Sequence, residues 1–215
     1  MNETNKSKLM PIPLPVSPAV FNTIGGTMTV LFIMALIENV TVLIVYKNNN
    51  KLRNKTNIWI ISVVICDLLI VLNAFPIVIA SSFARVYILG EKGCNYDGFV
   101  VTFLGCSSIF LLTGLSVHRY IIMLKKSKSK LFTRMKVLLS VLLCCVFGLI
   151  WGIVPFIGWG SFAQEGIGIS CAPNWRSDSP SDRTYMVAMY VFVLFLPIVI
   201  IGYCYCMIVS KVRTS

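Results

Sequence analysis

The chain has 215 residues, of which 57% are hydrophobic and 13% are charged, and its formal net charge is +11. A soluble globular domain carries about 25% charged residues, so this composition excludes a water-soluble monomer and indicates an integral membrane protein. The basic residues gather in two short segments without acids, at 47–55 and 125–136, whereas the other loops include acids such as Asp182. Short loops rich in Lys and Arg stay in the cytoplasm. We therefore expect both basic segments inside, the N-terminus outside, and no nucleic-acid partner.

Five apolar segments are long enough to cross a bilayer, which takes about 20 apolar residues per helix. Residues 1–19 form a polar and then proline-rich stretch, which predicts an extracellular tail, and residues 20–215 form the transmembrane domain. The predicted helices span residues 20–46, 56–83, 93–124, 136–157 and 183–211. The sequence therefore predicts an all-α transmembrane fold.

Ionisable residues inside an apolar span are costly and tend to face the interior of a bundle or a cavity. Asp67 lies in the middle of the second span, so we expect it to face such a cavity. Asp97 and Arg119 lie near the two ends of the third span, where a side chain can instead reach the membrane interface. The sequence does not explain why Glu38 lies in the first span.

The chain has eight cysteines, and six of them lie in apolar stretches, as small core residues do. Cys94 and Cys171 differ, because both lie on the expected outer side, where disulfides persist. They are the two cysteines placed to pair. The single histidine, His118, cannot build a metal site, and no nucleophile–base pair or phosphate loop points to an enzyme.

The expected outer tail carries two glycosylation sequons, which begin at Asn2 and Asn5. Two further matches, at Asn39 and Asn54, fall within the bilayer and on the cytoplasmic side, where glycosylation is not expected. We therefore predict glycosylation at Asn2 and Asn5.

The order of the polar and special residues resembles that of the rhodopsin-like G-protein-coupled receptors. Along the chain these residues are Asn39, Asp67, Cys94, His118-Arg119-Tyr120, Pro155, Cys171, Pro197 and Tyr205. Within that family the chain is most similar to the opsins, through the stretches Gly93–Phe99 and Trp151–Phe162 and through Glu165-Gly166 followed by Ser170-Cys171. The resemblance covers essentially the whole chain.

The resemblance implies the first five helices of a seven-helix receptor bundle, with a β-hairpin plug in the second outer loop. It implies a plasma-membrane photoreceptor that binds retinal and signals through a heterotrimeric G protein. In opsins, retinal forms a protonated Schiff base that needs an anionic counterion. Asp97 and Glu165 match the two positions where opsins keep one, and Cys94 and Cys171 match the outer disulfide.

The resemblance also assigns roles to three further sets of residues. The positions that line retinal are Val101, Thr102, Gly105, Ser170, Met189 and Tyr190. The positions that contact the G protein are His118, Arg119 and Tyr120. The positions of the activation network are Asn39, Asp67, Pro197 and Tyr205.

The chain also departs from the opsin pattern. Opsins attach retinal to a lysine in helix seven, and no lysine lies within an apolar span here. We therefore expect an incomplete or truncated opsin that cannot attach retinal at the usual place. His118 stands where most relatives have an acid that restrains Arg119, so we expect weaker restraint of the inactive state. Cys145 replaces the usual tryptophan of helix four.

Two other functions remain open at this point. One is a chemoreceptor of the same superfamily, which a lysine in helix seven of the full-length transcript would exclude. The other is a non-signalling truncated membrane protein that dimerises with full-length receptors.

Overall fold

The computed structural model describes residues 16–124 and 133–213, and its five helical spans agree with the predicted ones to within about one turn. The first four are α1 (Pro18–Asn48), α2 (Lys55–Ala84), α3 (Gly90–Leu124) and α4 (Arg134–Ile153). The fifth consists of α5 (Pro180–Met189), the π-helical η5 (Tyr190–Phe195) and α6 (Leu196–Arg213). Short 3₁₀ turns form η2 (Asn50–Leu52) and η4 (Val154–Ile157). All five spans are long and apolar enough to cross a membrane, so the predicted fold class is confirmed.

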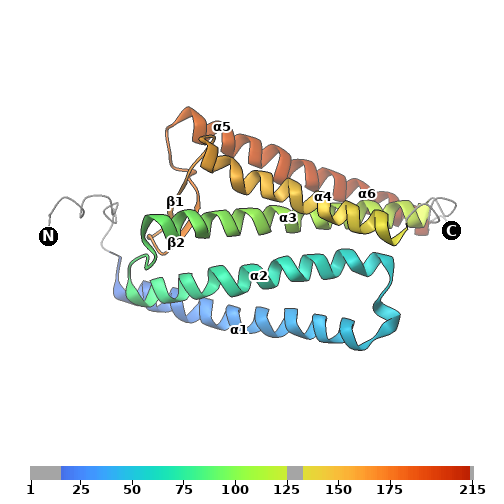
Figure 1. The fold of residues 1–215 in the computed structure, drawn as a ribbon, viewed down its shortest axis with the longest axis horizontal. Helices are drawn as coiled ribbons and strands as arrows, with labels where there is room; N and C mark the ends of the chain where they lie inside the picture. The colour runs from blue at the N-terminus through green and yellow to red at the C-terminus, as the bar shows by residue number, and fades with distance from the viewer. Residues whose placement is uncertain (1–15, 125–132, 214–215) are drawn as a thin grey trace.

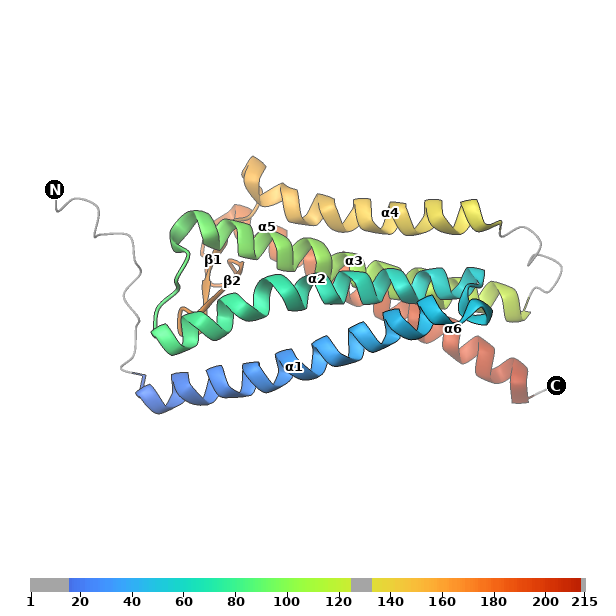
Figure 2. The ribbon, with the colours of Figure 1, turned by 60° about the horizontal axis from the view of Figure 1, so that its bottom comes forward.

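The helices lie side by side, with α3 in the centre of the bundle (Figure 1). α3 packs against α2, α4 and α6, while α1 packs against α2. Two strands, β1 (Phe162–Glu165) and β2 (Ser170–Pro173), lie at one end of the bundle, which we call the hairpin end. The connection from α1 to α2 and the last turn of α6 lie at the opposite end, which we call the basic end (Figure 2).

Polar side chains cap the helices where they begin. The Ser17 hydroxyl accepts a hydrogen bond from the Ala19 N–H, and Pro18 occupies the first turn of α1. The side chains of Asn54 and Thr133 accept hydrogen bonds from backbone N–H groups at the starts of α2 and α4. These caps satisfy N–H groups that a helix leaves without internal partners. They place each start slightly before the hydrophobic run from which it was predicted.

The hydrophobic core lies between α2, α3 and α4, where Leu111 and Val137 are at most 1% exposed. Helix α4 approaches α3 closely at Gly148. A Cβ atom there would lie 2.7 Å from the backbone nitrogen of Ser107 and would also meet the Ser107 hydroxyl. Ser107 is fully buried and donates a hydrogen bond to the Phe103 carbonyl at 2.7 Å. A small residue at 148 is therefore a condition for this helix contact.

We predict that Gly148→Ala lowers the thermal stability of the protein in detergent or nanodiscs. The added methyl group overpacks the contact between α3 and α4, which costs about 1–3 kcal/mol. The matched control is Gly202→Ala in α6, where a Cβ atom meets nothing within 4 Å and alanine is the better helix former. Equal melting temperatures for the two variants would contradict the proposed role of Gly148.

Candidate functional site

The β-hairpin forms a lid over the end of α3. Strands β1 and β2 are antiparallel, with Gln164 opposite Cys171 and Glu165 opposite Ser170. The Gly168 N–H donates a hydrogen bond to the Glu165 carbonyl at 2.9 Å and closes the turn. Gly166 and Gly168 have φ values of +58° and +79°, which glycine adopts without steric cost. The predicted hairpin plug is therefore present, with its strands against α3.

A disulfide joins the lid to α3, as predicted. Cys94 in α3 and Cys171 in β2 are bonded, with a Cα–Cα distance of 5.3 Å, and both are buried. One turn further along α3, a Cβ atom on Gly98 would lie 2.7 Å from the Cγ atom of Phe162 in β1. The missing side chain at position 98 thus lets the other strand of the lid rest on the helix.

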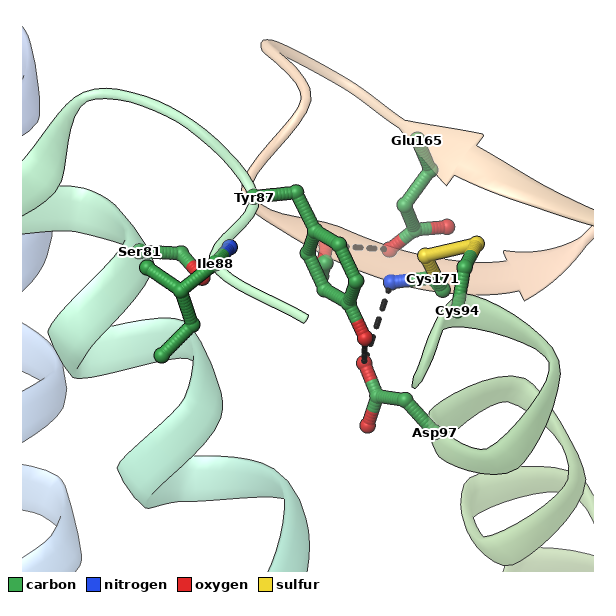
Figure 3. The surroundings of a disulfide bond; sticks show 8 residues. Ser81, Tyr87, Ile88, Cys94, Asp97, Glu165 and Cys171 are labelled. Carbon is green, nitrogen blue, oxygen red and sulfur yellow. Dashed lines mark hydrogen bonds between the residues drawn. A yellow bond between two sulfur atoms is a disulfide. The ribbon is translucent and has the colours of Figure 1, made fainter. Parts of the chain in front are cut away.

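Asp97 lies beneath the lid, one turn after Cys94, and is 2% exposed. Its Oδ2 atom accepts two hydrogen bonds of 3.3 Å, one from the Tyr87 hydroxyl and one from the Cys171 N–H (Figure 3). Asp97 is therefore turned into the protein rather than toward the membrane interface. A carboxylate buried this deeply persists only with such partners.

Tyr87 is a site residue that the sequence analysis missed. It lies in the short connection between α2 and α3, is 5% exposed, and packs against the disulfide. Burial raises the pKa of the Tyr87 hydroxyl, and the nearby charge of Asp97 raises it further. The hydroxyl therefore remains a protonated donor at physiological pH. No sequence pattern pairs a tyrosine in a loop with an acid ten residues later.

Glu165 ends β1 at the edge of the lid and is half-buried. Its Oε1 atom accepts a hydrogen bond from the Ser170 hydroxyl at 3.4 Å. The Glu165 carboxylate also lies within electrostatic reach of Asp97. The structure thus brings the two predicted counterions to the same end of α3, one beneath the lid and one within it (Figure 3).

Below the lid, α3 presents the residues that we expect to line retinal. Thr102 is 5% exposed, and its hydroxyl has no hydrogen-bond partner within residues 16–124 and 133–213. A Cβ atom on Gly105 would meet nothing within 4 Å, and Val101 is half-buried. This stretch of helix combines an unused hydroxyl, open space and an apolar side chain. These features leave room for an apolar group beside the helix.

The predicted residues on the fifth span are less enclosed. Met189 ends α5 and is half-buried, while Tyr190 begins η5 and is 57% exposed. Their role at a ligand remains a prediction.

A separate cavity lies between α2, α3, α4 and the fifth span. Its volume is about 620 Å³, and its lining includes Trp59, Phe110, His118, Phe147 and Phe192. None of the residues expected to contact retinal lines it. The cavity is therefore separate from the site beneath the lid.

At the basic end, His118 is 2% exposed, and its Nε2 atom lies 3.4 Å from the Thr56 hydroxyl of α2. The Tyr120 ring lies 6.0 Å from that of Tyr203 in α6, measured between centroids. In the part of the chain that the structure describes, no carboxylate lies within ion-pair distance of Arg119. The residue next to Arg119 in the chain, His118, thus contacts the Thr56 hydroxyl and not a carboxylate.

The four residues of the expected activation network are only partly brought together. Asp67 accepts a hydrogen bond from the Ser108 hydroxyl of α3 at 2.9 Å, as expected of a polar residue that faces the bundle. The Asn39 amide donates to the Ala35 carbonyl of its own helix at 2.8 Å. Pro197 and Tyr205 both lie in α6, and Tyr205 is 42% exposed. Asn2 and Asn5 lie outside the described residues.

A second set of hydrogen bonds, also missed from the sequence, fixes the lid to the fifth span. Asp182, which the sequence places among the acids of the loops, is 7% exposed and accepts a hydrogen bond from the Ser161 hydroxyl at 2.8 Å. The Tyr185 hydroxyl donates to the Trp151 carbonyl of α4 at 2.8 Å. The first bond joins the segment just before β1 to the first turn of α5, and the second joins α5 to α4.

Comparison with known proteins agrees with this architecture. Residues 38–215 match the family described as "7 transmembrane receptor (rhodopsin family)". The chain is 33% identical to the protein "Rhodopsin, GQ-coupled" of Mizuhopecten yessoensis, over 93% of this chain and 40% of that protein. It is 30% identical to Melanopsin-B of Xenopus laevis, over 94% of this chain and 38% of that protein. The chain thus spans about two fifths of the length of these relatives.

A solved structure gives the same result. The crystal structure of squid rhodopsin superposes with a TM-score of 0.86 at 26% sequence identity, over 93% of this chain and 57% of the squid chain. The chain therefore belongs to the rhodopsin family of seven-transmembrane receptors, as an opsin-like member whose five spans correspond to the first five helices of the bundle.

Proposed function

We propose that the protein containing this chain is a photoreceptor that binds retinal and signals to a heterotrimeric G protein. The observation that carries this proposal is the position of two acids, Asp97 and Glu165, at a lid held by a disulfide on α3. The similarity to a rhodopsin and to melanopsins supports the same function.

Retinal, once attached to a lysine, supplies a cationic centre and a change of shape in light. The residues of this chain provide the surroundings of that cation. In a site of low dielectric constant, a cation persists only beside an anion. Asp97 and Glu165 are the acids in reach of the lid, and the α3 face at Val101, Thr102 and Gly105 supplies the apolar wall. In this proposal Ser170, Met189 and Tyr190 complete the lining.

We further propose that the hairpin end faces the outside and the basic end faces the cytoplasm of the plasma membrane. The excess of Lys and Arg at one end supports this orientation. Asn2 and Asn5 would then be glycosylated on the outer side. At the basic end, Arg119 and Tyr120, next to His118, would contact the G protein, and Asn39, Asp67, Pro197 and Tyr205 would relay the change between the two ends.

We predict that the full-length gene product forms a pigment with a visible absorption band when it is reconstituted with 11-cis-retinal. Replacing either acid, by Asp97→Asn or Glu165→Gln, removes a charge that stabilises the protonated cation. The cation then loses its proton at lower pH, so the pH at which half of the band disappears falls by about 1 to 3. An absorption titration of each variant measures this change.

The matched control is Glu91→Gln, because Glu91 lies in the first turn of α3 but is exposed. This variant is expected to titrate like the unaltered pigment. Absence of any visible band would contradict the photoreceptor proposal and favour a chemoreceptor. A band that both acid replacements leave unchanged would contradict the assignment of the counterions.

A second prediction concerns signalling in darkness. His118→Glu places a carboxylate beside Arg119, and the resulting ion pair stabilises the inactive state. We expect G-protein turnover in darkness to fall by about fivefold or more, since couplings between sites are commonly 1–3 kcal/mol. Nucleotide exchange measured on reconstituted receptor and G protein tests this.

The control is His118→Gln, which keeps a neutral hydrogen-bonding side chain at the contact with Thr56. It should retain the dark activity of the unaltered receptor. If His118→Glu also leaves the dark activity unchanged, the lack of an acid at position 118 does not determine how strongly the inactive state is restrained.

A further inference from the structure

The hydroxyl of Tyr87 reaches Asp97 from a connection with a fixed path. Helix α2 ends at Ala84, and the next residue, Arg85, has a φ of +59° that reverses the chain, while its N–H donates to the Ser82 carbonyl. The Ile88 N–H then donates to the Ser81 hydroxyl at 3.3 Å, so the backbone is tied down on both sides of Tyr87. Ser81 and Ser82 are fully buried. The backbone of this connection therefore fixes where the Tyr87 ring lies.

The two oxygen atoms of Asp97 differ in their surroundings. Oδ2 accepts both the Tyr87 hydroxyl and the Cys171 N–H, each at 3.3 Å. Oδ1 receives no hydrogen bond from the residues that the structure describes, and it points away from the lid and from Tyr87 (Figure 3). Oδ2 is thus bonded to two other segments of the chain, the connection before α3 and strand β2, while Oδ1 is available to a positive charge.

We propose that Tyr87 is a positioning residue for Asp97: its hydroxyl fixes Oδ2 against the backbone of the lid, and it thereby orients Oδ1 toward the cation of a bound chromophore. The part that concerns the chromophore rests on the proposed photoreceptor function. The latch itself is formed by groups of this chain, namely the Tyr87 hydroxyl, the Asp97 carboxylate and the Cys171 N–H.

This arrangement couples the lid to the charge of Asp97. A hydrogen bond to an ionised acceptor is stronger than one to a neutral acceptor, so the anion holds both the Tyr87 hydroxyl and the Cys171 N–H. Of the described titratable groups, Tyr87 and Glu165 are those that interact with Asp97. Because the Tyr87 hydroxyl stays protonated at physiological pH, it acts as a constant donor and not as a proton switch.

The latch can be tested in the full chain without retinal. In lipid nanodiscs, Tyr87→Phe keeps the ring against the disulfide and removes one donor from Oδ2. We expect amide hydrogen exchange in residues 162–173 to become about tenfold faster, in line with the loss of a hydrogen bond to a charged group. In a double-mutant cycle with Asp97→Ala, the effect of Tyr87→Phe should disappear, because the shared acceptor is already gone.

The matched control is Tyr96→Phe. Tyr96 neighbours Asp97 in α3, but its hydroxyl donates to the Asn73 side chain of α2 at 2.8 Å. This variant should leave exchange in the hairpin unchanged. Equal exchange in Tyr87→Phe and Tyr96→Phe would overturn the latch.

The positioning role has a spectroscopic test in the full-length pigment. Tyr87→Phe lets the anion move away from the cation, so the absorption maximum should shift to longer wavelength, and the band should be lost at lower pH than in the unaltered pigment. Tyr96→Phe should change neither property. Faster exchange in the hairpin with unchanged absorption would reduce Tyr87 to a structural residue and overturn the proposal. If the unaltered protein forms no pigment, the photoreceptor function fails, and the exchange experiment alone decides on the latch.

Discussion

The attachment of the hairpin to the end of α3 is the constraint on which the candidate site depends. Two residues of α3, one turn apart, hold the hairpin. Cys94 forms the disulfide with Cys171, and Asp97 accepts a hydrogen bond from the Cys171 N–H. Gly98 then allows β1 to rest on the helix surface. A two-stranded hairpin is at best marginally stable alone in water, so these three contacts explain why this one keeps its place over the bundle. They also explain how a carboxylate remains buried at the end of a membrane helix.

Inside the bundle, polar side chains satisfy one another across helices or within a turn. Ser108 donates to Asp67, and Thr56 lies beside His118, so each contact joins α2 to α3 at a different depth. Lipid offers no hydrogen bonds to polar groups, and both contacts therefore favour one relative position of these two helices. The Thr102 hydroxyl, buried without a protein partner in the described residues, departs from this rule at the place where a ligand is expected.

Much of the architecture follows from the sequence, because the signals for it are local or depend on topology. Hydropathy gives the five spans, the distribution of Lys and Arg assigns Cys94 and Cys171 to one side, and the motif around Glu165 gives the hairpin. The bond between Tyr87 and Asp97 could not be predicted, since the path of the loop at Arg85 decides where the ring lies. The burial of Asp182 could not be predicted for a related reason: it depends on Ser161, which reaches Asp182 from another segment.

The π turn at Tyr190–Phe195 sets the rotational phase of the last span. Tyr185 and Pro197 are both buried, although twelve residues of unbroken α-helix would turn them about 120° apart around the axis. One additional residue in the wide turn removes about 100° of that difference, which brings both side chains to the same azimuth. A helical wheel drawn through the whole span with a single pitch would therefore assign part of the lipid-facing surface to the interior. The buried and lipid-facing positions before the π turn and after it therefore have to be assigned with two separate helical wheels.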